Sequence, residues 1–180
     1  YMVNWKSNVF PGILGRTCDR PCEPACRRGR VEEKNAEKPE PVAICRLKRV
    51  AADNKADVRP LMPRPAAKKN GRKIACIGAG PASLTVARDL APLGYAVTVF
   101  DQDPRAGGMI WSQIPRFRLP MEVIDEEVGY IMDLGVEFKG GTKISSMKEM
   151  LGKGYDAIFV GTGAPRGRDL DIPGRKEGAK

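Results

Sequence analysis

Residues 73–83 read Lys-Ile-Ala-Cys-Ile-Gly-Ala-Gly-Pro-Ala-Ser, an apolar run followed directly by a glycine turn. The apolar run predicts a buried parallel strand, and a helical pattern begins immediately after the turn. Gly78 permits a turn that a side chain would obstruct, and Gly80 lets a phosphate approach the backbone. The N–H groups at the start of the following helix would then face the anion. This order of elements predicts a binding site for a dinucleotide pyrophosphate.

A carboxylate follows the glycine turn at the distance that such a site requires. Residues 96–100 form a second apolar run, and Asp101 ends this run about 20 residues after Gly80. A carboxylate at the tip of the second strand can accept hydrogen bonds from ribose hydroxyls. The alternative is an ordinary strand–helix–strand turn that binds no ligand.

The C-terminal part of the chain alternates strands with helices. The expected elements are strand 73–77, helix 81–93, strand 96–100, a glycine-rich loop, helix 120–133, strand 135–139, helix 146–151 and strand 156–160. Apolar side chains recur at helical spacing and predict a stripe that faces the core: Val123, Ile124, Val128, Ile131, Met132 and Leu134. The alternation predicts an α/β fold with a parallel sheet and right-handed crossovers.

Composition limits the functions that the chain can have. Its 180 residues suffice for one good core and a small second unit. No apolar run is long enough to span a bilayer, and no signal-peptide pattern is visible, so we expect a cytoplasmic protein without a membrane span. Histidine is absent, which excludes a histidine-based catalytic triad. Catalysis would therefore fall to a cofactor, to thiolates or to other groups.

The net charge of +9 is concentrated near the N-terminus. Residues 1–75 contain 18 Lys and Arg against 8 Asp and Glu, whereas residues 76–180 contain 13 against 14. The basic residues are scattered among prolines and cysteines with few aromatic side chains, which argues against nucleic-acid binding. Two explanations remain: a surface that docks an acidic electron-transfer partner, or one that compensates a buried anionic cluster.

The N-terminal part is expected to form a separate unit. Residues 1–58 bear cysteines and are predicted to be helical or irregular, with a polar, exposed loop over 30–40. Pro41 opens a helical pattern in which Val42, Cys45 and Arg49 share one face. Ile44, Leu47 and Val50 occupy the neighbouring face. Residues 59–71 form a Pro-rich basic linker that is expected to sustain neither helix nor sheet.

Three cysteines follow one another at four-residue spacing: Cys18, Cys22 and Cys26. Prolines between them argue against a regular helix, and a proline-broken loop that gathers thiols is suited to a soft metal centre. Cys45 could supply the fourth thiolate of a [4Fe–4S] cluster. Zinc is the rival, although Cys-x2-Cys pairs would be expected, and reduced thiols without a metal are the third possibility. Cys76, in the first strand, is predicted to be a core residue.

Several motifs occur together along the chain, and their order is characteristic. They occupy residues 15–29, 41–49, 78–83, 107–110, 114–120 and 161–164. In these motifs the chain resembles the glutamate synthase small (beta) subunit family, which includes the amino-terminal half of dihydropyrimidine dehydrogenase. The resemblance implies a small cysteine-bearing helical segment with [4Fe–4S] clusters, followed by a Rossmann-like FAD-binding domain over 72–180. It also implies an NAD(P)H-binding domain inserted into the FAD domain.

The resemblance assigns a role to individual residues. The FAD-binding residues that it implies are Gly78, Ala79, Gly80, Pro81 and Ala82 in the pyrophosphate turn, Asp101 at the adenosine ribose, Gly107, Gly108 and Met109 along the diphosphate and ribityl chain, Arg118 as a cationic partner, Ile144 at the adenine, and Gly161, Thr162 and Gly163 in a second glycine turn. Cys18 and Cys22 would serve one cluster and Cys26 the other. Cys45 lies one helical turn before the family's side-chain ligand and is a substitute for it.

The chain departs from the family pattern at both ends. It begins at Tyr1 without the family's upstream cysteines, and it stops near residues 172–174, where the NAD(P)H domain would follow. We therefore expect a piece of a longer polypeptide, or a subunit completed by other oxidoreductase subunits.

The implied function is electron transfer in an NAD(P)H-linked oxidoreductase, between FAD and [4Fe–4S] clusters and on to a partner's catalytic site. No acid, base or nucleophile is predicted. One alternative is a non-catalytic assembly subunit with a structural nucleotide, and another is an NAD-binding module with structural zinc. The Gly107–Gly108 pair and the turn at 161–163 favour FAD, because a simple NAD domain needs neither.

Overall fold

The computed structural model describes residues 1–30, 40–165 and 167. The expected polar loop over 30–40 lies largely outside these residues, as does the end of the chain near residues 172–174. Among the described helices, none combines the length and the apolar character needed to cross a bilayer.

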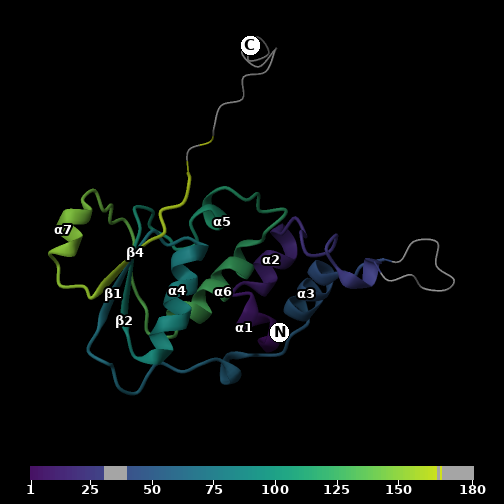
Figure 1. Ribbon diagram of the computed structural model, residues 1–180, viewed down its shortest axis with the longest axis horizontal. Coiled ribbons are helices and arrows are strands. Elements are labelled where there is room, and N and C mark those ends of the chain that lie inside the picture. Colours follow the sequence, from purple (N-terminus) through teal and green to yellow (C-terminus); the bar gives the residue numbers. More distant parts are fainter. Residues whose placement is uncertain (31–39, 166, 168–180) are drawn as a thin grey trace, which may run out of the picture.

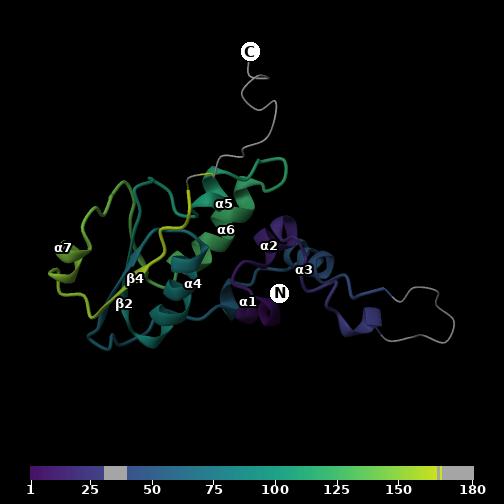
Figure 2. The ribbon, with the colours of Figure 1, turned by 45° about the horizontal axis from the view of Figure 1, so that its top comes forward.

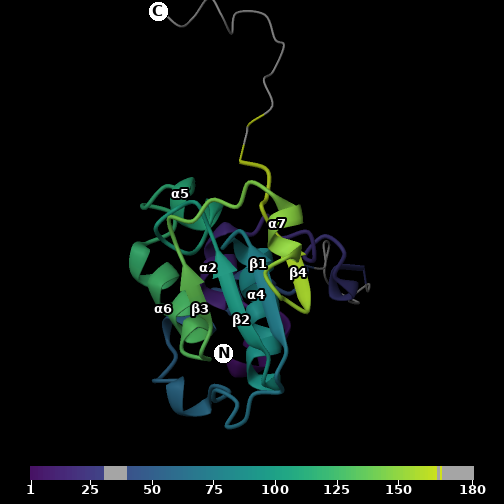
Figure 3. The same cartoon turned by 90° about the vertical axis from the view of Figure 1, so that its left-hand side faces the viewer.

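Four parallel strands form the sheet, as Figure 3 shows. Along the chain they are β1 (Lys73–Ile77), β2 (Ala96–Phe100), β3 (Glu137–Lys139) and β4 (Ala157–Val160), and their order in the sheet is β3-β2-β1-β4. Parallel neighbours need crossover connections, and helices supply them. The α/β fold expected from the alternating pattern is therefore confirmed.

Helices cover both faces of the sheet (Figure 1). α4 (Pro81–Leu90) and α6 (Met121–Met132) lie on one face, and the short α7 (Met147–Leu151) lies on the other. β1 alternates accordingly, because Ile74 and Cys76 join the core beneath α4 and α6. Ala75 and Ile77 pack with Met150 of α7. Each face of the sheet thus has its own apolar layer, as a buried parallel strand requires.

Along residues 73–160, most element boundaries lie close to the expected ones, with three differences. The expected helix 81–93 ends as α4 at Leu90 and continues as a 3₁₀ turn over Ala91–Leu93. The expected strand 135–139 begins only at Glu137, because Gly135 has a φ of +83° that is incompatible with a strand. The glycine-rich loop contains a short helix, α5 (Met109–Ser112), that the sequence did not predict.

Three N-terminal helices lie beside α6 and α4 (Figure 2); the second of them packs on α6, and the third packs on the second. They are α1 (Met2–Ser7), α2 (Pro11–Thr17) and α3 (Ile44–Asp53). Phe10 and Ile13 belong to the same buried core as Ile124 and Leu134. The division into 1–58, 59–71 and 72–180 stays a prediction. The expected linker does contain one 3₁₀ turn, at Arg59–Leu61, which corrects the expectation that it sustains no helix.

The apolar stripe predicted along residues 123–134 is confirmed. Ile124, Val128, Ile131 and Leu134 are buried, and Val123 and Met132 pack against them. The helical pattern that was expected to open at Pro41 begins only at Ile44, so Val42 lies outside α3, and the buried face of this helix consists of Cys45, Lys48 and Ala52. Leu47 and Val50 are each 57% exposed, so the neighbouring apolar face of this helix lies largely toward solvent.

α2 and α3 approach each other closely at Gly15. A Cβ atom at this position would lie 2.9 Å from the Cα of Arg49, which is backbone and cannot swing away. Glycine is therefore required for the observed helix contact, and not for an unusual backbone angle.

Gly15→Ala is expected to lower the free energy of unfolding by about 1–3 kcal/mol, because the added methyl group forces α2 and α3 apart. Gly129→Ala in α6 is the matched control, since its Cβ would meet no atom within 4 Å. That change is expected to raise the stability by about 0.5–1 kcal/mol, because alanine loses less backbone entropy than glycine in a helix. Urea unfolding measures both values. A Gly15→Ala variant as stable as the wild type would contradict the close packing of the two helices.

Candidate functional site

Two glycine turns meet at the carboxyl ends of β1 and β4. Gly78 has a φ of +93°, and a side-chain carbon there would collide with the carbonyl oxygen of Gly161. The N–H of Gly161 donates to the carbonyl oxygen of Ile77 at 2.8 Å. A side-chain carbon at Gly161 would in turn collide with the hydroxyl of Ser83, which is fully buried at the start of α4. Backbone therefore packs directly on backbone here, and only glycine fits at either turn.

A third glycine segment, Gly107–Gly108, packs on the first glycine turn, at residues 78–80. Gly107 donates its N–H to the carbonyl oxygen of Ala79 at 2.8 Å. A Cβ at Gly108 would lie 2.9 Å from the Cα of Gly80. At Gly80 itself, however, a Cβ would meet no protein atom within 4 Å. Gly80 thus borders open space at the N-terminus of α4, where an anionic group could approach the free N–H groups.

Asp101 holds the first glycine turn through its side chain. One carboxylate oxygen, Oδ2, accepts the N–H of Ala79 at 2.5 Å, and the other, Oδ1, accepts the N–H of Asp103 at 2.9 Å. Its backbone carbonyl accepts the N–H of Thr142 at 2.7 Å. The carboxylate is therefore fixed in orientation, with lone pairs left over for a further donor.

A cavity of about 280 Å³ opens beside this carboxylate. It is lined by Ile77, Gly78, Phe100, Asp101, Gln102, Thr142, Lys143, Ile144, Thr162, Gly163 and Pro165. Apolar side chains and the fixed carboxylate thus share one cavity. Such a lining fits the aromatic ring face of a nucleobase attached to a sugar with hydroxyl groups. The residues present therefore fit the adenosine end of a dinucleotide.

The structure brings five of the site residues expected from the sequence into this cavity: Gly78, Asp101, Ile144, Thr162 and Gly163. Sequence reasoning missed Gln102, Thr142 and Lys143. Gln102 and Lys143 are each adjacent in sequence to an expected residue, and Thr142 is two residues from Ile144, but none belongs to a recognisable motif. Proximity in sequence to Asp101 and to Ile144 was the signal that could have found them.

The remaining expected nucleotide-binding residues lie outside the cavity lining. Pro81 and Ala82 form the first turn of α4, and Met109 opens α5 with a side chain that is 49% exposed. Arg118 donates from Nε to the carbonyl oxygen of Arg16 at the end of α2, at 3.1 Å. The role of Arg118 as a cationic partner of the phosphates stays a prediction.

Two of the four expected metal-binding cysteines lie close together. Cys18 follows α2 directly, and Cys45 is the second residue of α3 and only 4% exposed. Burial and the adjacent Cys18 thiol raise the pKa of the Cys45 thiol. The carboxylate of Glu23 accepts the backbone N–H of Cys45 at 3.1 Å. The packing of α2 on α3 therefore brings the thiols of Cys18 and Cys45 next to each other.

The other two candidates are more exposed. Cys22 is at the surface, and backbone hydrogen bonds at Val42 and Arg28 hold the pKa of the Cys26 thiol below its usual range. Within residues 1–30, 40–165 and 167, no three side chains of Cys, Asp or Glu gather as a set that could hold a metal ion. Metal binding by these cysteines therefore stays a prediction. Cys76 is fully buried, and burial raises its pKa to about 11, which confirms it as a core residue.

Comparison with known proteins agrees with the geometry. Residues 76–135 match the family model of an NAD(P)-binding Rossmann-like domain. The structure resembles that of FprA from Mycobacterium tuberculosis in complex with NADPH, with a TM-score of 0.50 at 24% identity, over 57% of this chain and 25% of FprA. This likeness concerns the fold alone.

Two relatives match along nearly the whole chain. The chain is 38% identical, over 94% of its length, to the NADP(+)-dependent formate dehydrogenase subunit beta of Moorella thermoacetica, and covers 26% of that protein. It is 34% identical, also over 94% of its length, to the NADPH glutamate synthase small chain of M. tuberculosis, and covers 34% of it. The chain thus spans between a quarter and about a third of these relatives. Along nearly its whole length, the chain is therefore homologous to the glutamate synthase small chains and the related oxidoreductase beta subunits.

Proposed function

We propose that this chain is the flavin-binding electron-transfer unit of an NAD(P)H-linked oxidoreductase. The observation that carries the proposal is the cavity in which Gly78, the fixed carboxylate of Asp101 and Thr162 converge. The relatives support it, because they are named as subunits of NADP-dependent oxidoreductases. No residue of the chain is proposed as an acid, base or nucleophile.

FAD is the ligand that we propose for this site. Asp101 would accept hydrogen bonds from the adenosine ribose, and Ile144 would contact the adenine. The pyrophosphate would lie over Gly80 at the start of α4, where an added Cβ would meet no protein atom. The Gly107–Gly108 loop, which packs on Gly80, extends the glycine-lined surface beyond what a simple NAD site needs. When bound, FAD accepts a hydride and releases electrons singly.

We further propose that Cys18, Cys22, Cys26 and Cys45 bind iron–sulfur clusters. The proximity of the Cys18 and Cys45 thiols supports this, and thiolates are the ligands that such clusters require. Other subunits, or a further part of the same polypeptide, would supply the remaining ligands and the NAD(P)H-binding domain. The basic N-terminal part would suit an acidic electron-transfer partner.

The visible absorption spectrum of the anaerobically purified chain tests this function. We expect a flavin band together with a broad thiolate-to-iron shoulder, and both should bleach when dithionite is added. A colourless protein that contains about one zinc ion would contradict the proposal and favour a structural zinc site. A bound nucleotide that NADH and NADPH fail to reduce, even in the assembled complex, would favour a structural assembly subunit.

Cys45→Ala and Cys76→Ala separate the thiolate contribution from general damage. Both residues are buried cysteines, but only Cys45 lies beside a second thiol. Iron content after anaerobic reconstitution should fall in Cys45→Ala and remain at the wild-type level in Cys76→Ala. Equal iron content in the two variants would rule out Cys45 as a ligand.

A further inference from the structure

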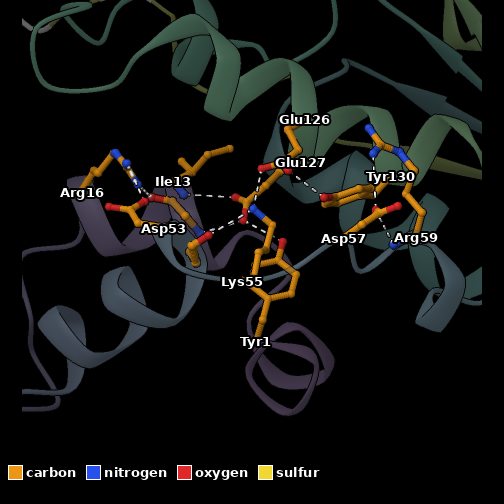
Figure 4. Close-up of polar contacts among 12 residues, drawn as sticks. Tyr1, Ile13, Arg16, Asp53, Lys55, Asp57, Arg59, Glu126, Glu127 and Tyr130 are labelled. Carbon is orange, nitrogen blue, oxygen red and sulfur yellow. Dashed lines mark hydrogen bonds and ion pairs between the residues drawn. The ribbon is translucent and has the colours of Figure 1, made fainter.

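Glu127 is a buried carboxylate in the middle of α6, only 1% exposed, and the sequence pattern did not single it out. Its two oxygens accept three hydrogen bonds, shown in Figure 4. Oε1 accepts the N–H of Gly12 at 2.7 Å and the hydroxyl of Tyr1 at 2.9 Å. Oε2 accepts the N–H of Ile13 at 3.0 Å. Burying a carboxylate costs free energy, so a buried carboxylate is expected only where its oxygens accept hydrogen bonds.

The two N–H groups belong to the first turn of α2. These groups have no partner within their own helix, and a side chain at the preceding position normally accepts one of them. Phe10 precedes α2 and offers no such acceptor. Glu127 therefore caps α2 from another helix, and its negative charge lies at the positive end of the α2 dipole.

The contact at Gly12 is tight. A Cβ there would lie 3.1 Å from Oε1 of Glu127 and 3.1 Å from Cγ1 of Val123, so even alanine would require one of these side chains to shift. Burial raises the pKa of Glu127, while the N–H groups of Gly12 and Ile13 act in the opposite direction by stabilising the ionised form.

The cap belongs to a network that joins three helices (Figure 4). Lys55, just after α3, pairs with Glu126 of α6 at 2.7 Å. Arg16 of α2 pairs with Asp53 of α3 at 2.6 Å. Glu127 is the buried member that joins α2 directly to α6, and the pairs nearer the surface tie α3 to both.

The same helix also lies beside the glycine loop that packs on the first glycine turn. Ile124, one turn before Glu127, has its Cγ2 atom 3.6 Å from where a Cβ of Gly107 would lie. At the other end of the capped helix, Cys18 follows α2 immediately and adjoins the Cys45 thiol. α6 therefore lies beside the glycine loop at Ile124 and caps, through Glu127, the helix that leads to Cys18.

We infer that Glu127 is a positioning residue that sets the placement of the Cys18–Cys45 pair relative to the nucleotide cavity. Its importance for electron transfer rests on the proposed function, whereas the placement itself does not. An apolar side chain of similar size would fill the space but would accept neither N–H. α2, with its first turn uncapped, would then be free to shift along α6.

The test measures the reactivity of individual thiols in the metal-free full chain. Glu127→Gln and Glu127→Ala are compared with Glu122→Gln, an exposed glutamate in the first turn of the same helix. Iodoacetamide labelling is followed at each cysteine by mass spectrometry. In Glu127→Gln, Cys45 is expected to react about tenfold faster than in the wild type, the change that loss of one hydrogen bond to a charged group produces. Cys76 is the internal reference, because it is fully buried in the sheet and its labelling reports general opening of the core.

The reference separates a local effect from general unfolding. Faster labelling of Cys45 with unchanged Cys76 supports the inference, and Glu122→Gln should match the wild type at both cysteines. An unchanged Cys45 rate would overturn the inference, as would a parallel rise at Cys45 and Cys76. Should Glu127→Ala fail to fold, the labelling rate of Glu127→Gln still tests the inference, because glutamine keeps the size of the side chain. No flavin or iron enters the measurement, so its failure is distinct from failure of the proposed function.

Discussion

Gly80→Ala is expected to weaken the binding of FAD or ADP by about 10- to 100-fold while leaving the melting temperature unchanged. A Cβ at this position meets no protein atom within 4 Å, and the backbone is extended, with φ of −78°, so the folded chain accepts alanine. The methyl group would instead occupy the space that we assign to the pyrophosphate. Overpacking of this kind costs about 1–3 kcal/mol, which corresponds to the stated loss of affinity. Isothermal titration with ADP measures it.

Gly78→Ala provides the contrast, because this glycine serves the fold. Its φ is +93°, and the added carbon would collide with the carbonyl oxygen of Gly161. We expect a lower melting temperature, with a loss of about 1–3 kcal/mol for the strained backbone alone. Wild-type ADP affinity in Gly80→Ala would show that no phosphate group lies beside this residue. Loss of stability in Gly80→Ala would show that the space is not open.

Asp101→Ala is expected to reduce both stability and nucleotide binding. The N–H of Ala79, a fully buried residue, would lose its acceptor, at a cost of about 1–3 kcal/mol of unfolding free energy. The proposed contact with the ribose would be lost as well, which should weaken ADP binding by roughly 10- to 100-fold. Thermal unfolding and titration with ADP measure the two effects separately.

Asp101→Asn and Asp103→Asn refine this experiment. Asparagine at 101 keeps one acceptor oxygen, so it should retain more stability than alanine but still bind the nucleotide weakly. Asp103 is two residues away and does not line the cavity, so Asp103→Asn should leave ADP binding unchanged. A stable Asp101→Asn variant with wild-type affinity would mean that the carboxylate serves only the glycine turn.

Local patterns in the sequence were sufficient to predict the sheet. The apolar runs at 73–77 and 96–100 are strands with the expected ends, and the helical spacing around Ile124 predicted the buried face of α6. These features depend on backbone preference and on burial along one element, and both repeat at short range. The misplaced boundaries lie where a single residue interrupts the pattern, such as Gly135 with its positive φ. The short helix α5 was missed because only four residues form it.

Some residues of the candidate nucleotide site could likewise be predicted from the sequence, whereas others could not. Gly78, Gly80 and Asp101 could be identified from spacing, since the strand–turn–helix order and the distance to the second strand are local features. That Asp101 also holds the N–H of Ala79 became visible only in the folded chain. So did Lys143 and Gln102 in the wall of the cavity.

The order of strand, turn and helix could be read from the linear sequence, because short-range periodicity and φ preferences encode it. The motifs along the chain indicated the resemblance to the glutamate synthase small subunits. The contacts of Gly78 with Gly161, of Gly15 with Arg49 and of Glu127 with Gly12 could not be read from it. Each joins residues that are far apart in sequence, and their meeting depends on how crossovers and helix packing fold the chain in space. A carboxylate at position 127 carries no local mark of its role, because its partners are backbone N–H groups that every residue except proline possesses.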